Sequence, residues 1–121
     1  MENKYSVCMA TVPNYALAAE IAESLVEKKL AACVNLLTNI KSVYRWQGKV
    51  EKSEEVILLI KTRSKLVRDV IQAVKEKHTY SVPEVIFYDI SEGNEDYLDW
   101  IGANTLFSSN IPADEDKGKN K

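Results

Sequence analysis

The stretch AACVNLLTNIKSVYRWQGKVEKSEEVILLIKT, residues 31–62, decides the fold. Its first half alternates apolar and polar side chains, which is the period of a strand with one buried face. The apolar residues at even-numbered positions are Ala32, Val34, Leu36, Ile40, Tyr44 and Trp46. Gln47-Gly48 fits a tight two-residue turn, because glycine accepts the positive φ that such turns require. The stretch therefore predicts a β-hairpin with arms over Ala31–Trp46 and Lys49–Thr62.

The predicted hairpin is long for a chain of 121 residues. Arms of about fifteen residues at ~3.3 Å per residue would reach roughly 50 Å, whereas a domain of this length has a radius of gyration near ~14 Å. The return arm ends in Val56–Ile60, which is apolar on both faces. A half-apolar ribbon that overhangs its domain and carries Tyr44 and Trp46 at its tip requires a partner to cover it.

The elements on either side of the hairpin complete the fold. Residues 5–11 alternate as a strand, and apolar residues at helical spacing predict a helix over 15–29 with Asn14 as its N-cap. A second helix is expected after another N-cap at Ser64, followed by a strand over 84–90.

A third helix is expected after Asn94, with Tyr97, Trp100 and Ile101 on its inward face. The resulting order, β-α-β-β-α-β-α, predicts an α+β protein with the ferredoxin-like split β-α-β sandwich, a long hairpin between its second and third strands and an extra C-terminal helix. Right-handed crossovers place the first two helices on one face of a four-stranded antiparallel sheet. Nothing in this pattern covers the other face, which favours another subunit in a closed cyclic assembly.

The composition is that of one globular domain with a short tail. Residues 1–110 are predicted to form a single domain, and residues 111–121 are predicted to be a disordered tail. The chain carries 16 basic and 18 acidic residues, which argues against nucleic acid as a partner. No apolar run is long enough to span a bilayer and no signal-peptide pattern is present, so we expect a cytoplasmic protein without a membrane partner.

The usual signatures of catalysis are missing from the sequence. There is no G-x-S-x-G elbow, no P-loop, no G-x-G-x-x-G and no H-E-x-x-H. His78 is the single histidine, and no serine or cysteine is marked as its nucleophile. The pair Glu54-Glu55 looks like a carboxylate dyad, but neighbouring residues in a strand point to opposite faces. We therefore expect a protein that is not an enzyme.

Residues 78–84, HTYSVPE, form the densest polar and aromatic cluster. One interpretation is a binding lip made of an imidazole, a phenol and a carboxylate. The other is a helix C-cap followed by a proline-fixed turn, in which His78 closes the core and complements the helix dipole; the residues alone favour this second interpretation. Cys8, Cys33 and His78 lie on separate elements without metal-ligand spacing, so a metal site would need assembly to bring ligands together.

Several linked motifs, in order, resemble the CutA divalent-cation-tolerance family. They are LAACVN (30–35), SVYRWQGKVE (42–51), EEV with IKT (54–62), HxYxVPE (78–84) and DYLxWI (96–101). The resemblance extends over about residues 4–104. It implies a ferredoxin-like subunit in a homotrimer built like the PII signalling proteins, with hairpins that embrace neighbouring subunits. It also implies a role in tolerance of divalent metals, with copper or another divalent metal as the ligand.

The chain departs from the family at the positions of the copper ligands proposed for some bacterial members. Ala10 stands where those members have a cysteine, and Lys77 stands where they have the first histidine of a His-His pair. His78 is therefore the one metal-ligand candidate that the resemblance supplies. Thr79 and Ser81 replace the proline and glutamate of the same segment.

The resemblance also implies a ligand cleft between subunits. Its candidate residues are Tyr44, Trp46, Lys61, His78, Tyr80 and Glu84. Lys61 would meet an anionic ligand, and Trp46 would supply a stacking face. The leading hypothesis is a non-catalytic homotrimer that binds copper or another divalent metal, or that senses a small ligand as PII proteins do. The alternatives are a trimeric scaffold for a protein partner and an undetected enzyme.

Overall fold

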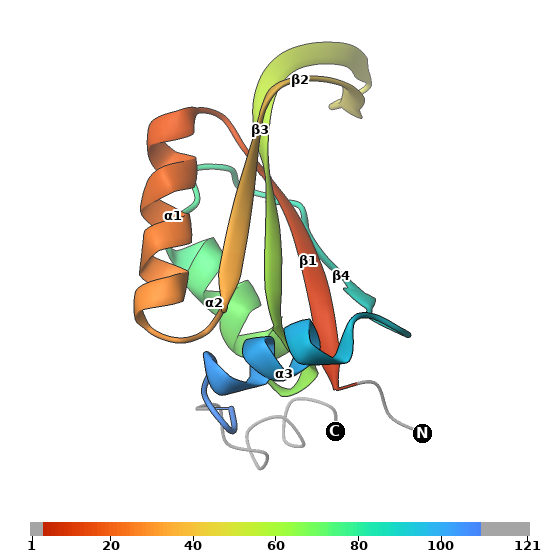
Figure 1. Cartoon of the computed structure of the whole chain (residues 1–121). Helices are drawn as coiled ribbons and strands as arrows, with labels where there is room; N and C mark the ends of the chain where they lie inside the picture. Colours follow the sequence, from red (N-terminus) through yellow and green to blue (C-terminus); the bar gives the residue numbers. More distant parts are fainter. Residues whose placement is uncertain (1–3, 110–121) are drawn as a thin grey trace, which may run out of the picture.

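The computed structural model describes residues 4–109, and its strands form one antiparallel sheet in the order β2-β3-β1-β4. The strands are β1 (Tyr5–Val12), β2 (Cys33–Trp46), β3 (Lys49–Arg63) and β4 (Val85–Asp89). The helices are α1 (Tyr15–Glu27), α2 (Val67–Lys77) and α3 (Glu95–Ala103), with a 3-10 turn, η1 (Ser64–Leu66), before α2. This arrangement confirms the predicted ferredoxin-like α+β fold (Figure 1). The predicted tail, residues 111–121, lies outside the described residues.

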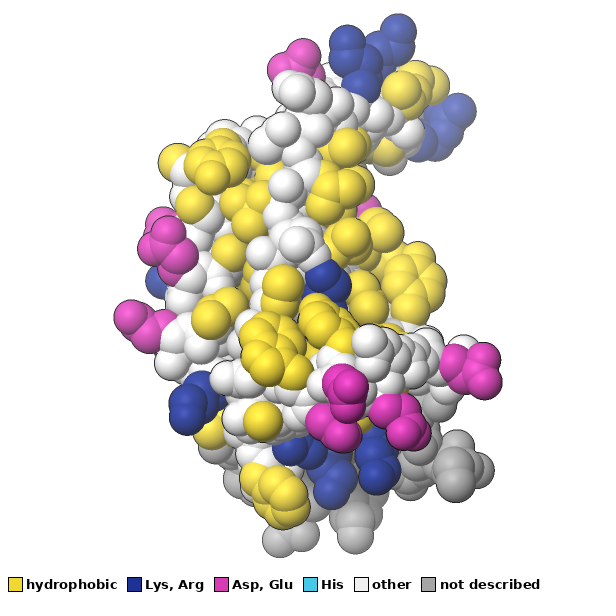
Figure 2. Space-filling model, in the orientation of Figure 1, with side chains coloured by type: hydrophobic (Ala, Val, Ile, Leu, Met, Phe, Trp, Pro, Cys, Tyr) yellow, Lys and Arg dark blue, Asp and Glu magenta, His cyan; other side chains and the backbone are white. Residues whose placement is uncertain are grey.

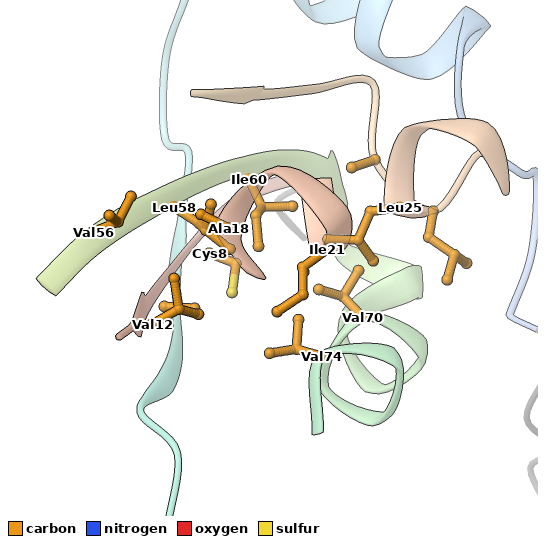
Figure 3. Close-up of a cluster of buried hydrophobic side chains, with 13 residues drawn as sticks. Cys8, Val12, Ala18, Ile21, Leu25, Val56, Leu58, Ile60, Val70 and Val74 are labelled. Atoms are coloured by element: carbon orange, nitrogen blue, oxygen red, sulfur yellow. The ribbon is translucent and has the colours of Figure 1, made fainter. Parts of the chain in front are cut away.

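The hydrophobic core lies between the sheet and the layer formed by α1 and α2 (Figure 3). Every second residue of β1 and β3 points toward the helices, as the strand period requires. The fully buried members on the sheet side are Cys8, Ala10, Val12, Leu58 and Ile60, and those on the helix side are Ala18, Ile21, Leu25, Val70 and Val74. The core covers one face of the sheet, and the opposite face is available for other contacts.

The two N-cap predictions had different outcomes. Asn14 caps α1 as predicted, because its Oδ1 accepts a hydrogen bond from the Leu17 N–H at 2.8 Å. The prediction for Ser64 was wrong: α2 starts at Val67 after a 3-10 turn, and no side chain caps it. The Ser64 N–H donates to the Lys4 carbonyl at 2.8 Å, and its hydroxyl lies 2.7 Å from that of Ser6. Ser64 is thereby held against β1 rather than turned toward the helix.

Strand β2 contains a bulge in its middle. Its pairing with β3 runs regularly to Leu37 opposite Ile57 and resumes at Ile40 opposite Glu55, so β2 carries one extra residue. Asn39, within the bulge, has φ +64°, a left-handed conformation that asparagine tolerates better than most residues. One inserted residue exchanges the two faces for all side chains beyond it.

The bulge contradicts the prediction that the apolar residues at alternating positions face the core along the whole first arm of the hairpin. Val34 and Leu36 pack against the helical core. Beyond the bulge, Tyr44 and Trp46 lie on the opposite face of the sheet, where Trp46 is 44% exposed. The hairpin therefore presents its aromatic side chains on the side away from α1 and α2.

The bulge gives a direct test at Asn39. Asn39→Val should lower the free energy of unfolding by about 1–2 kcal/mol, because a β-branched side chain clashes with the backbone at positive φ. Asn39→Gly, the matched control, should change it by less than about 0.5 kcal/mol, since glycine adopts positive φ freely. Urea denaturation followed by circular dichroism measures both, and equal midpoints for the two variants would contradict the left-handed conformation.

We call the face away from α1 and α2 the open sheet face. Strand register places these residues on it: Val7, Met9, Cys33, Asn35, Leu37, Ile57, Leu59, Lys61, Ile86 and Tyr88. Leu37, Ile86 and Tyr88 are 38%, 42% and 55% exposed, which is high for large apolar side chains that share one surface. Figure 2 shows hydrophobic side chains gathered over the sheet above α3, with basic side chains at the far end of the hairpin. Most of the open sheet face is therefore apolar, and the rest of residues 4–109 leaves it uncovered.

Helix α3 covers only the base of the open sheet face. The Arg63 Nη2 donates to the Gly102 carbonyl at 2.7 Å, and its Nε donates to the Thr105 hydroxyl at 3.1 Å. A Cβ at Gly102 would come within 2.7 Å of the Tyr5 hydroxyl, so the absence of a side chain allows this close approach. The third helix is thus tied to β3 through its C-terminal end.

The inward face predicted for α3 was wrong for two of its three residues. Ile101 is buried, but Tyr97 and Trp100 are 41% and 44% exposed and stack on each other with ring centroids 5.6 Å apart. The helix has nine residues and lies at the edge of the core, so it buries a narrow strip of its surface. Within residues 4–109, none of the helices has the length and apolar character needed to cross a membrane.

Candidate functional site

The end of the β2-β3 hairpin curves away from the sheet (Figure 1), and the hairpin forms a groove with residues 80–84. We call it the hairpin groove; its volume is about 640 Å³. Its lining is Thr11, Ser42, Val43, Tyr44, Trp46, Glu55, Tyr80, Ser81, Val82 and Glu84. Four of the six predicted cleft residues are therefore brought together: Tyr44, Trp46, Tyr80 and Glu84. The bulge in β2 makes this arrangement, because it turns the two hairpin aromatics toward the groove side.

His78 lies beside the groove and is held by two hydrogen bonds within the chain. Its Nε2 donates to the Thr11 carbonyl at 2.7 Å, and its Nδ1 accepts from the Tyr80 N–H at 3.1 Å. This pattern requires a neutral ring with its proton on Nε2. His78 is also the C-cap residue of α2. Because both ring nitrogens are engaged, a metal ion at His78 would have to displace one of these bonds.

Lys61 does not lie with the other predicted residues. It is on the open sheet face, opposite Cys33 of β2 and Val7 of β1. Its Nζ donates to the Asn35 Oδ1. Lys61 therefore cannot meet a ligand in the hairpin groove of the same chain.

Glu55 is a groove residue that the sequence reasoning missed. Its side chain is buried at 8% exposure, and its Oε2 accepts a hydrogen bond from the Tyr80 hydroxyl at 2.7 Å. Burial and this hydrogen bond raise the pKa of Tyr80 above its ordinary value, so the phenol stays protonated and keeps donating. The signal in the sequence was the two-residue period of the strand, because Glu55 lies on the same face of β3 as the apolar residues Ile57 and Leu59.

The two cysteines lie apart from each other and from Lys77, the residue at a proposed bacterial ligand position. Cys8 is buried in the core, where burial raises the pKa of its thiol to about 12. Cys33 is half-buried on the open sheet face. Lys77 forms an ion pair with Glu20 at 3.3 Å. Within the part of the chain that the structure describes, no three His, Cys, Asp or Glu side chains are grouped closely enough to hold a metal ion.

The sheet order, the two helices on one face and the projecting hairpin define the class of the protein as a ferredoxin-like α+β domain. Within that class, residues 6–104 match the family model of the CutA1 divalent ion tolerance protein. The chain belongs to this family, as its linked motifs indicated.

Individual relatives agree with the family match. The chain is 46% identical over 99 residues to the divalent-cation tolerance protein CutA of Thermus thermophilus, which covers 82% of this chain and 96% of that protein. It is 46% identical over 105 residues to protein CutA of Mus musculus, covering 87% of this chain but only 59% of the mouse protein. The solved structure of CutA1 from Oryza sativa superposes with a TM-score of 0.85 at 43% identity, covering 88% of this chain and 97% of that one.

Proposed function

We propose that this protein is a homotrimer that supports divalent-cation tolerance by binding a ligand, without catalysing a reaction. The observation that carries this proposal is the open sheet face, with Leu37, Ile86 and Tyr88 exposed on one surface. Contiguous exposed apolar surface of this kind marks an interaction site. A closed cyclic assembly covers such a face, and three copies is the number that the family resemblance implies.

The edges of the sheet support assembly as well. Strands β2 and β4 are the outer strands, so each has one side without a neighbouring strand within the described chain. Exposed edges of this kind are templates for pairing with another chain. The hairpin extends β2 and β3 away from the helices (Figure 1), where it can reach a neighbouring subunit.

The ligand proposed for the trimer is a divalent metal held between subunits. Residues 4–109 contain no group of three candidate ligands. A metal site is therefore better built from residues of two subunits than from residues of one chain. His78 would contribute an imidazole after exchanging one of its two hydrogen bonds, and the other ligands would come from a second copy. Binding of this kind requires no nucleophile or general base.

A small ligand in the hairpin groove is the second candidate, in the manner of a PII-like sensor. The groove favours it because Tyr44, Trp46 and Tyr80 supply apolar walls and Glu84 supplies a polar contact, a composition typical of ligand pockets. A trimer that takes up neither metal nor small ligand would instead favour the scaffold for a protein partner.

Calorimetric titration of the purified protein with Cu²⁺ and Zn²⁺ tests the metal version. We expect micromolar binding that His78→Ala weakens at least about tenfold, since an imidazole ligand is lost. Lys77→Ala is the matched control, because Lys77 is the adjacent residue and its side chain pairs with Glu20 on the surface. Absence of binding to the wild-type protein, or equal affinity in both variants, would contradict a metal site at His78.

A further inference from the structure

Glu55 is a buried carboxylate without a cation. It is 8% exposed, and the one hydrogen bond that it accepts from a described residue comes from the neutral hydroxyl of Tyr80. Among residues 4–109, no lysine, arginine or histidine forms an ion pair with it. Removing a carboxylate from water is costly unless an opposite charge or several hydrogen bonds compensate. The hairpin groove is therefore lined by a carboxylate that none of the described cationic side chains pairs with.

The walls of the groove are suited to an organic cation. The rings of Tyr44 and Trp46 line the groove at 43% and 44% exposure, so in one chain both have surface that other groups of the chain do not cover. Aromatic faces attract ammonium and guanidinium groups, and a desolvated site strengthens that attraction. A carboxylate on one side and aromatic rings on the other is the combination that recognises such groups.

A bare metal ion fits these residues less well. Zinc in proteins takes several His, Cys or carboxylate ligands, and no group of three such side chains is present in residues 4–109. An anionic or wholly apolar ligand would leave Glu55 without its counter-charge. The chemistry of the groove is therefore matched by an ammonium or guanidinium group.

We propose that the hairpin groove binds an organic cation through its ammonium or guanidinium group. Glu55 is the counter-charge, and Tyr44 and Trp46 are the stacking walls. Tyr80 positions the Glu55 carboxylate through its hydroxyl. The proposal rests on the proposed function, because it names the class of ligand for the small-ligand version of that binding protein.

Two sources can supply a cation of this chemistry to the groove. It is either a free amine or guanidine in solution, or a basic side chain from the hairpin of a second copy. The second source is available because Arg45, Lys49 and Lys52 stand near the hairpin turn, where Figure 2 shows basic side chains gathered.

The test compares Glu55→Gln with Glu54→Gln in the full chain. Glutamine keeps the size of the side chain and an oxygen for the Tyr80 hydroxyl, so the first change removes mainly the charge. Glu54 is the ideal control, because it is the neighbouring glutamate and is exposed on the other face of the strand. The probes are propylammonium chloride and methylguanidinium chloride, with 1-butanol as the neutral probe, followed by calorimetry and the Trp46 indole signal in NMR spectra.

If the cation is a free molecule in solution, the cationic probes should bind the wild-type protein and 1-butanol should not. Glu55→Gln should then lower the affinity for the probes at least about tenfold. If the cation is a side chain of a second copy, the probes should not bind. Glu55→Gln should then raise the dissociation constant of the assembly at least about tenfold. In both cases Glu54→Gln should stay within about twofold of wild type. The proposal is overturned if the two variants match in probe binding and in assembly. That failure would leave the trimer mass and metal binding untouched, so it is distinct from failure of the proposed function.

Discussion

Leu59→Glu is expected to convert the proposed trimer into single chains. Leu59 lies in the middle of the open sheet face, between Met9 of β1 and Asn35 of β2 in the strand register. In one chain its side chain is half-buried, so a carboxylate there can still reach water. In an assembly that covers this face the carboxylate would be buried without a partner, which costs several kcal/mol. Light scattering should report the mass of one chain at micromolar concentration.

Val26→Glu is the control for this experiment. Val26 is also an exposed apolar residue, at 42%, but it lies on α1 and away from the open sheet face. The control should keep the wild-type mass. A trimer mass for Leu59→Glu would show that the subunits associate through some other surface.

Leu58→Ala should destabilise the fold itself. Leu58 is the neighbour of Leu59 but points to the opposite side, where it is fully buried among Cys8, Ile60 and Ala18 in the core. Truncation of a buried leucine removes apolar contacts and leaves a cavity, which costs about 2–5 kcal/mol. The free energy of unfolding is best measured in the Leu59→Glu background, because dissociation of subunits would otherwise add to unfolding.

The control for the core variant is Val50→Ala. Val50 lies on the hairpin and is 61% exposed, so its truncation should change the free energy of unfolding by less than about 0.5 kcal/mol. Guanidinium denaturation followed by circular dichroism at one protein concentration measures both variants. Equal midpoints would place Leu58 outside the core and contradict the strand register.

The parts of the fold that local interactions determine were predictable from the sequence. The Asn14 cap and the Gln47-Gly48 turn, in which both residues have positive φ, follow from the chemistry of those side chains and of the backbone. The bulge at Asn39 was not predictable, because one inserted residue leaves the hydrophobic pattern on each side intact. Only pairing with β3 reveals that the parity has changed.

The sequence predicted the residues of the candidate site only in part, because tertiary contacts decide which of them come together. Tyr44 and Trp46 were singled out as large aromatics at the hairpin tip, and the fold places them opposite Tyr80 and Glu84. Lys61 was grouped with them through the family resemblance, but β3 carries it to the open sheet face. Glu55 was set aside as one half of an improbable dyad. Its hydrogen-bond donor is Tyr80, which is 25 residues away in the chain, and only the tertiary structure brings the two together.

The central claim is that the open sheet face and the hairpin build a trimer. Light scattering on the full-length wild-type protein at micromolar concentration tests it most directly. The account predicts a mass three times that of the 13.7 kDa chain. A mass equal to a single chain would contradict it.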